Sequence, residues 1–504
     1  MKIRKIFNLN NILLLLLAIY FVFCISYDRE IRYFSFIPWT IIIFSLFLFI
    51  QKFIDKIKLK SSKRIRLIEF SIYTTIIITP IIFSIVSNNY YPIDFKYIWN
   101  DLANNNYSDW HPFLYTIIFV KLPSIFYYSV SSCKVFQGIY IYLCLIYLCY
   151  FLRKYFFNVG ITIIILLLIV LNPSFLTMSS TLLKDVPFSY TLLVGTIFLI
   201  EIVITKGDWI FKTKNKVLFI IMCFFMVYTR HNGIANFLLM MILLIAFYKK
   251  HRKFYVSFFI VFIIARVIIT GPIYNFLNVK PNIGTAEMLG VPLNQIRYIE
   301  ERGKGFKKEY QDKIYGIFSK KCFNRNYSKY WYFNEIKFNC PHSSEKLKTN
   351  ALDIVEIWLN LAIKNPKLAL EDYLAITSIY WKIDHYKSFY WLYSNTKLHK
   401  NEIYYYTNFI YKSPLKFLFI DLGSALFLIL FSIYLIIRKG VDDIRKFIPY
   451  VLVISNLIII CCLVTGDEMR FGYSLITCTY PLIIYALYNN QRKKQLKKYD
   501  RIMK

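Results

Sequence analysis

Long, uninterrupted runs of hydrophobic residues recur along the whole chain and are separated by short polar stretches. A helix of about 20 apolar residues crosses the hydrocarbon core of a bilayer, and most of these runs approach that length. The runs do not alternate between apolar and polar positions, which excludes the strands of a membrane β-barrel. The pattern predicts an all-α polytopic membrane protein of about twelve transmembrane helices. The predicted spans are residues 11–27, 37–51, 67–87, 133–152, 160–178, 186–204, 217–229, 234–248, 254–271, 416–437, 447–465 and 471–489.

Two neighbouring segments interrupt this series. Residues 88–112 form a polar loop that is acidic on balance. The apolar stretch 112–130 follows it, but this stretch contains Lys121 and Pro123, and counting it as a span would invert every later loop. We therefore expect a helix that lies along the outer membrane surface or re-enters it, and a full span is the alternative.

The chain divides into three parts on this pattern. Residues 1–271 form a transmembrane bundle that includes the outer loop and the interfacial helix. Residues 272–415 are too long for a hairpin, and helical periodicity at about 351–383 predicts a small, mostly helical external domain. Residues 416–504 form the last transmembrane helices and a basic cytoplasmic tail.

Charge fixes the expected orientation. Lys and Arg number 62 against 29 Asp and Glu, which gives a formal net charge of +33. The basic residues lie in short loops beside spans, as the positive-inside bias and anionic lipids require, and no separate basic domain exists to bind nucleic acid. We expect both termini to be cytoplasmic, with residues 1–27 holding an uncleaved first span. The active face is then extracytoplasmic, on a cell membrane.

The chain has ten cysteines, most of them inside predicted spans. Buried cysteines of that kind are usually inert small hydrophobes. Cys322 and Cys340 lie in the long polar segment and can form one disulfide if that segment faces an oxidising compartment.

This orientation brings the chemically useful side chains to the outer face. A bundle that gathers polar groups at one end is expected to perform chemistry or recognition there. The residues concerned are Asp94, Asp101, Asp109, His111, Lys184, Asp185, Arg230, His231, Asp467, Glu468 and Arg470.

The outer loop supplies three carboxylates. Asp94 precedes Asp101 by seven residues, so both point the same way if the stretch is helical. Asp109 stands just before His111 and Pro112, where it either caps the next helix or acts as a general base. Interfacial carboxylates can also hold a divalent cation. The alternative is a solvated loop with one capping aspartate.

The pair Lys184–Asp185 opens a predicted span. It is either an anchor and helix start, or a site in which Lys184 binds phosphate while Asp185 binds a metal or the acceptor. Arg230 is a planar, permanently charged phosphate ligand, and His231 is a further substrate contact unless it only forms the turn.

The stretch GDEMRFGY, residues 466–473, precedes the last predicted span. Glu468 and Arg470 either pair with each other, or Arg470 reaches an anionic lipid phosphate. The sequence has no Gly-rich phosphate loop, HExxH or GxSxG, so an activated lipid phosphate is the expected energy source.

The order of these motifs resembles the GT-C membrane glycosyltransferases, which include protein O-mannosyltransferases, aminoarabinose transferases and oligosaccharyltransferases. It is most similar to a bacterial branch of unassigned function, over residues 67–270 and 447–489. The motifs that carry the resemblance are DWHPFLYT (109–116), LLKDVPF (182–188), RHNG (230–233) and DEMRF (467–471).

The resemblance implies an inverting transferase with a polyprenyl-phosphate sugar donor and a glycan, lipid or protein hydroxyl as acceptor. It implies that Asp94 is the base or orients the acceptor, and that Asp185 is the second acidic position. Lys184, Arg230 or Arg470 would steady the leaving phosphate. Some relatives use a divalent cation such as Mg²⁺ or Mn²⁺. The alternative function is a transporter or flippase for a lipid-linked saccharide or another anionic solute, whose site would lie near the bilayer midplane.

Overall fold

The computed structural model describes most of the chain. The described residues are 9–27, 33–55, 66–87, 92–155, 158–280, 288–323, 343–385, 402–438, 440–463 and 468–502. Within these ranges the fold is helical, and the only β contact is an isolated bridge between Ser108 and Lys280.

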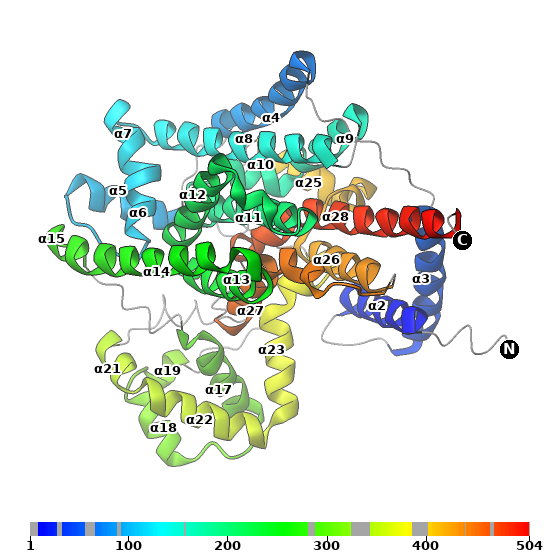
Figure 1. Ribbon diagram of the computed structural model, residues 1–504. Helices are drawn as coiled ribbons and strands as arrows, with labels where there is room; N and C mark the ends of the chain where they lie inside the picture. Colours follow the sequence, from blue (N-terminus) through cyan, green and yellow to red (C-terminus); the bar gives the residue numbers. More distant parts are fainter. Residues whose placement is uncertain are drawn as a thin grey trace.

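Nine helical segments among the described residues are long and apolar enough to cross a membrane, which bears out the predicted all-α polytopic class (Figure 1). Short 3-10 or π turns extend three of them. The segments are α2 (Leu9–Ser26), α3 (Tyr33–Ile54), α4 (Leu67–Ser87), α8 (Val130–Tyr155), α11 (Asp185–Ile204), α14 (Arg252–Ile268) continued through α15 (Tyr274–Phe276), α26 (Leu422–Ile437), α27 (Val451–Cys462) and α28 (Met469–Ile502).

The structure differs from the expected twelve spans at three places. The run predicted at 160–178 is broken into α9 (Val159–Val170) and α10 (Pro173–Ser179), which meet at 66°. Pro173 cannot continue a helix from before it, and the Asn172 side chain accepts a hydrogen bond from the backbone of Ser174. The runs at 217–229 and 234–248 become α12 (Thr213–Thr229) and α13 (Gly233–Phe247), of 17 and 15 residues, shorter than a bilayer core usually requires.

The apolar stretch predicted at 112–130 forms one continuous short helix, Phe113–Phe126, and it is not among the nine long spans. It consists of α6 (Phe113–Tyr115), a π turn and α7 (Leu122–Phe126). One face is buried, with Phe119 1% exposed, whereas Ile125 on another face is 70% exposed. Such a two-faced helix suits a membrane interface, and its position there stays a prediction.

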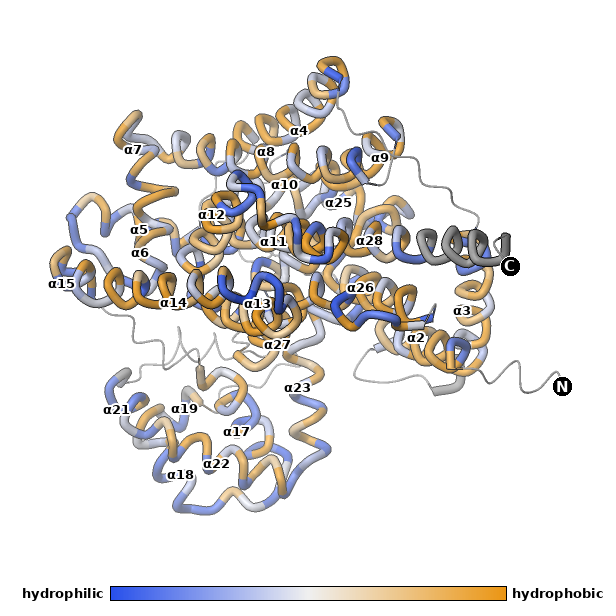
Figure 2. The backbone as a smooth tube through the Cα atoms, viewed as in Figure 1, coloured by the Kyte–Doolittle hydropathy of each residue, from blue (hydrophilic) through white to orange (hydrophobic). Residues whose placement is uncertain are grey.

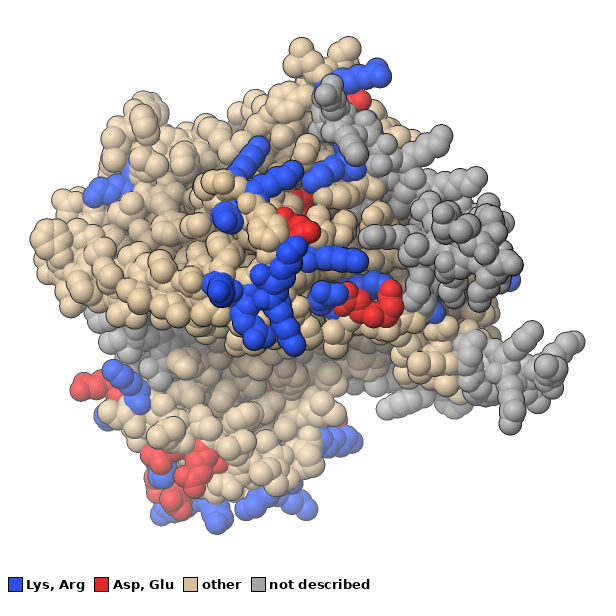
Figure 3. Space-filling model, viewed as in Figure 1, with Lys and Arg blue, Asp and Glu red and all other residues tan. Residues whose placement is uncertain are grey.

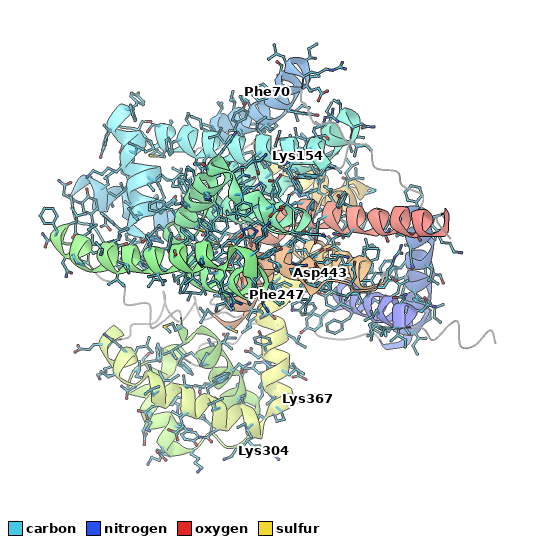
Figure 4. All side chains as sticks on the ribbon, viewed as in Figure 1. Phe70, Lys154, Phe247, Lys304, Lys367 and Asp443 are labelled. Atoms are coloured by element: carbon cyan, nitrogen blue, oxygen red, sulfur yellow. The ribbon has the colours of Figure 1, made fainter. Side chains whose placement is uncertain are left out.

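A separate helical unit lies beyond one side of the bundle, and it carries more hydrophilic residues than the bundle does (Figures 1 and 2). It has its own apolar core, which includes Leu293, Ile354 and Leu361. Figure 4 marks Lys304 and Lys367 on this unit. Its helices are α17 (Gly290–Arg302), α18 (Lys308–Tyr315), α19 (Lys320–Phe323), α21 (Ser344–Thr349), α22 (Ala351–Lys364) and α23 (Pro366–Trp381).

The segment predicted as one external domain therefore has two parts. Helix α25 (Glu402–Lys412) returns to the bundle and packs against α10 and α4. Cys340 and the side chain of Cys322 lie outside the described residues, and so does their predicted disulfide.

Helix α23 joins the external unit to the bundle. It packs against α26 and α28, and two glycines permit the close approach. A Cβ atom at Gly472 would lie 2.9 Å from the ring of Tyr380, and one at Gly423 would lie 2.3 Å from the backbone oxygen of Lys382. Contacts this short require glycine, because real Cβ atoms do not approach neighbours so closely.

The basic loops meet at one end of the bundle. Lys250, before α14, pairs with Asp208, between α11 and α12, and Arg445, before α27, stacks on the ring of Tyr248. Lys and Arg gather over the middle of the bundle face in Figure 3, and Figure 4 marks Lys154 and Asp443 there. These loops were all predicted to be cytoplasmic, and the structure places them on a common side.

Candidate functional site

The opposite end of the same helices carries a cluster of charged side chains, which we call the charged cluster. It is formed by Asp94, His111, Lys184, Asp185, Arg230, Glu468 and Arg470. Asp94 lies in the first turn of α5 (Ile93–Ala103), and Asp185 begins α11. Arg230 follows the last residue of α12, and Arg470 lies in the first turn of α28. Residues far apart in sequence therefore meet where helices of the bundle begin or end.

Arg470 bridges two carboxylates. Its Nη1 lies 2.5 Å from Oδ2 of Asp94, and its Nε forms an ion pair with Oε2 of Glu468. These side chains are mostly buried, at 14% exposure for Arg470 and 22% for Asp94. The contact with Glu468 was one of the alternatives predicted from the sequence, whereas the contact with Asp94 joins residues 376 positions apart.

Arg230 pairs with Asp185 at the start of α11. Nη1 lies 2.8 Å from Oδ1, with the two side chains 9% and 0% exposed. The guanidinium also stacks on the ring of Phe471, 5.1 Å from its centroid, and the guanidinium of Arg470 lies 4.8 Å from the same ring. One aromatic ring thus holds both guanidiniums, so the two ion pairs belong to one site.

The Arg230–Asp185 pair is incompletely hydrogen-bonded. Among the described residues, Nη1 of Arg230 and both carboxylate oxygens of Asp185 lack an aligned hydrogen bond, although they are buried. Buried polar atoms are almost always hydrogen-bonded in proteins, and exceptions call for an explanation such as a ligand or an ion.

Lys184 contributes a third cation. Its Nζ lies 3.5 Å from the backbone oxygen of Trp110 and has no ion-pair partner within the described ranges. Burial lowers the pKa of Lys184 to about 8, although Asp185 and Asp94 oppose that change. At neutral pH this side chain is therefore mostly a cation, and no described carboxylate pairs with it.

His111 lies beside Lys184 and is only 6% exposed. Its ring packs on that of Trp110, with the centroids 5.1 Å apart. Burial and the charge of Lys184 hold the pKa of His111 well below its usual range, with Asp94 opposing, so the imidazole is neutral. Its Nε2 atom has no hydrogen-bond partner in the part of the chain that the structure describes.

The carboxylates of the cluster differ in proton affinity. Burial alone would raise the pKa of Asp94, but the charge of Arg470 and the hydrogen bond from Arg470 outweigh it, so the pKa lies well below the usual range. Burial raises the pKa of Glu468, and Arg470 opposes that rise. Asp94 is consequently ionised at neutral pH, and Glu468 is the carboxyl group that takes up a proton more readily.

Asp109 has a structural position next to the cluster. Its Oδ1 accepts hydrogen bonds from the backbone N–H of Phe113 at 3.1 Å and from the hydroxyl of Tyr274 at 3.2 Å. Its backbone oxygen lies 2.9 Å from Nε2 of His231. These contacts match the helix-start role that the sequence offered as the alternative to catalysis. The contact of His231 supports the loop that carries Asp109.

Asp101 is not brought into contact with the cluster. Helix α5 does set Asp94 and Asp101 two turns apart, as the spacing predicted, but Asp101 accepts a hydrogen bond from Ser108 at 3.3 Å. Asp467 lies outside the described residues. Sequence reasoning missed Trp110, Tyr274 and Phe471. Trp110 and Phe471 adjoin predicted site residues in the sequence, whereas no signal in the sequence pointed to Tyr274.

Comparison with known protein families gives one result. The chain belongs to the DUF6020 family. This is a family of unknown function, and its model matches residues 13–411. The DUF6020 match includes Asp94, Lys184 and Arg230 but ends before Glu468 and Arg470. No curated protein and no solved structure matches the chain.

Proposed function

We propose that this DUF6020 protein is a membrane glycosyltransferase of the GT-C type. It would move a sugar from a polyprenyl-phosphate carrier to a hydroxyl of a glycan, lipid or protein, on the outer face of a cell membrane. The observation that carries the proposal is the convergence of three cations and three carboxylates at one end of an apolar bundle, opposite the end where the basic loops meet.

The leaving group of such a reaction is a lipid phosphate. Lys184, Arg230 and Arg470 lie at helix ends, where the phosphate of a membrane-embedded lipid would lie. Preorganised positive charge around a developing phosphate anion is the largest single contribution that a protein makes to a transfer of this kind. Lys184 contacts the phosphate directly. The two arginines, which are paired with carboxylates, add positive charge near it.

The acceptor hydroxyl needs a carboxylate within hydrogen-bond reach, and Asp94 is the ionised candidate. In the reaction the acceptor oxygen bonds to the anomeric carbon, and the bond from that carbon to the phosphate oxygen breaks. The hydroxyl proton passes to Asp94, and the phosphate leaves with the bonding electron pair. The hydroxyl becomes acidic as its oxygen bonds to carbon, so a carboxylate of low pKa suffices.

The location of the cluster favours an enzyme over a transporter. Transport sites usually lie near the bilayer midplane on broken helices of repeated halves. The charged cluster lies instead at the ends of α5, α11, α12 and α28. Translocation without sugar transfer in the assay below would support the transporter.

The test compares two aspartates of the same helix. The full chain is reconstituted in vesicles with undecaprenyl-phosphate-linked hexoses and pentoses, and released undecaprenyl phosphate is measured. Asp94→Asn should lose activity by about 100-fold or more, because the proton acceptor is gone. Asp101→Asn, two turns away and outside the cluster, should retain it. Full activity in Asp94→Asn contradicts the assignment.

A second experiment tests the side of the membrane. A cysteine replaces Ser108 after the native cysteines are removed. An impermeant thiol reagent should label it from outside intact cells, because the outer loop carries this position. Labelling only after permeabilisation would place the cluster on the cytoplasmic side and remove the case for a lipid-phosphate sugar donor.

A further inference from the structure

The carboxylates of the charged cluster suggest a site for a divalent cation, which some GT-C enzymes use. Whether such a cation fits depends on the groups that surround these carboxylates. Mg²⁺ demands oxygen ligands at about 2.0–2.1 Å in octahedral geometry. Asp94, Asp185 and Glu468 are the carboxylates available. In the described ranges no three Asp, Glu, His or Cys side chains are arranged to hold a metal ion.

Guanidinium groups already occupy these carboxylates. Nη1 of Arg470 lies 2.5 Å from Asp94 and its Nε pairs with Glu468, and Nη1 of Arg230 lies 2.8 Å from Asp185. A divalent ion bound to any of these oxygens would sit against a permanent positive charge. The repulsion at such distances in a buried site is large, because little solvent screens it.

Two arginines pair with the three carboxylates of the cluster, which leaves Lys184 as a cation for a phosphate. Three carboxylates face Arg230, Arg470 and Lys184, and Lys184 is the cation without an ion-pair partner among the described residues. The phosphodiester of a lipid-phosphate sugar carries one negative charge. Nε2 of His111 is buried beside Lys184 and has no hydrogen-bond partner among the described residues, and it supplies a second polar contact for a phosphate oxygen.

We propose that the charged cluster binds a lipid phosphate headgroup without a divalent cation, with the guanidiniums of Arg230 and Arg470 supplying the charge that a metal provides elsewhere. Lys184 and His111 are the side chains that contact the phosphate. This inference rests on the proposed function for the identity of the ligand, but the absence of a metal requirement is testable without it.

The first experiment uses Mn²⁺ alone with the purified full chain in detergent, and bound ion is detected by electron paramagnetic resonance. The wild-type protein should show no bound Mn²⁺ that depends on the cluster. A Mn²⁺ signal that Asp94→Asn or Asp185→Asn removes would overturn the proposal, whether or not the protein transfers sugar. Arg470→Ala, which releases Asp94 and Glu468, should gain Mn²⁺ binding.

The second experiment measures the Kd for undecaprenyl phosphate in EDTA and in excess Mg²⁺ or Mn²⁺. The two values should agree. A Kd that rises tenfold in EDTA and recovers with metal overturns the inference while leaving the proposed function intact. If undecaprenyl phosphate binds under neither condition, the proposed function fails and so does the assignment of the ligand, while the Mn²⁺ result still decides the metal question.

Paired lysine variants identify the phosphate contact. Lys184→Gln should weaken undecaprenyl phosphate binding by about tenfold or more, because a charge-assisted hydrogen bond is lost. Lys121→Gln is the matched control, since Lys121 donates to the hydroxyl of Tyr107 at 2.7 Å and lies outside the cluster. Equal weakening in both variants would contradict the role of Lys184.

Discussion

Two buried ion pairs, one at each end of the bundle, differ in how completely they are hydrogen-bonded. Beside the basic loops, Arg153 reaches Glu69 through two nitrogens, at 3.0 and 3.3 Å. In the charged cluster, Arg230 lies 2.8 Å from Asp185, and no aligned hydrogen bond joins the two in the part of the chain that the structure describes. With two hydrogen bonds, the Arg153–Glu69 pair meets its own hydrogen-bonding needs. It also links α4 to α8. The second pair keeps unmet hydrogen-bonding capacity, which is where a ligand would gain affinity.

The largest expected effect is a difference in sugar transfer between variants of these two pairs. The double variant Arg230→Gln/Asp185→Asn removes both charges of the cluster pair and should lower sugar transfer by about 100-fold or more, because phosphate stabilisation is lost. The matched double variant Arg153→Gln/Glu69→Gln should stay active. The vesicle transfer assay measures both, and similar activities would erase the distinction between the two ends.

Single substitution at the basic end should instead reduce stability. Arg153→Ala leaves Glu69 buried without its partner, which costs about 3–5 kcal/mol for pairs of this kind. Thermal unfolding of the detergent-solubilised protein should show a lower Tm than for the matched double variant Arg153→Gln/Glu69→Gln. A Tm equal to that of the wild type would mean that this pair is not structural.

The pH dependence of ligand binding should show the loss of the proton from Lys184. Its pKa of about 8 means that the side chain is charged below that pH and loses its proton above it. Affinity for undecaprenyl phosphate, an anion, should therefore be full below pH 8 and should fall as pH rises through 8. In Lys184→Arg the decline should disappear, because a guanidinium stays charged. The same decline in wild type and variant would assign the titration to another group.

The smallest effect is expected at the exposed Lys250–Asp208 pair, whose side chains are 68% and 55% exposed. Solvent-exposed pairs contribute little because water and salt screen them. Lys250→Ala should leave Tm and transfer unchanged in the same two assays. A clear loss of stability there would show that the basic loops are more tightly organised than exposure suggests.

Much of the fold was readable from the sequence because an apolar run long enough to cross a bilayer needs no tertiary information. The count of spans was less accurate. Asn172 and Pro173 carry a helix-start signal inside a run that was taken as one span. The short runs at 217–229 and 234–248 were counted as spans, although α12 and α13 have only 17 and 15 residues. Local hydropathy does not report bends or final helix lengths.

The members of the charged cluster were predicted from loop orientation, but their pairing was not. Arg470 meets Asp94 across 376 residues, and the sequence gives no rule for choosing that partner. Asp109 is held by Tyr274, a residue that the sequence pattern assigned to the external domain. Which carboxylate faces which cation depends on how helices pack, and this is decided by side chains throughout the bundle.

Gly472 gives the external unit a direct mechanical link to the site. Because Gly472 has no side chain, the ring of Tyr380 packs directly on the backbone of α28, two residues beyond Arg470. Helix α23 therefore contacts the first turn of α28, which carries Arg470. A displacement of the external unit along α23 would thus reach Arg470 through this contact between a ring and a backbone.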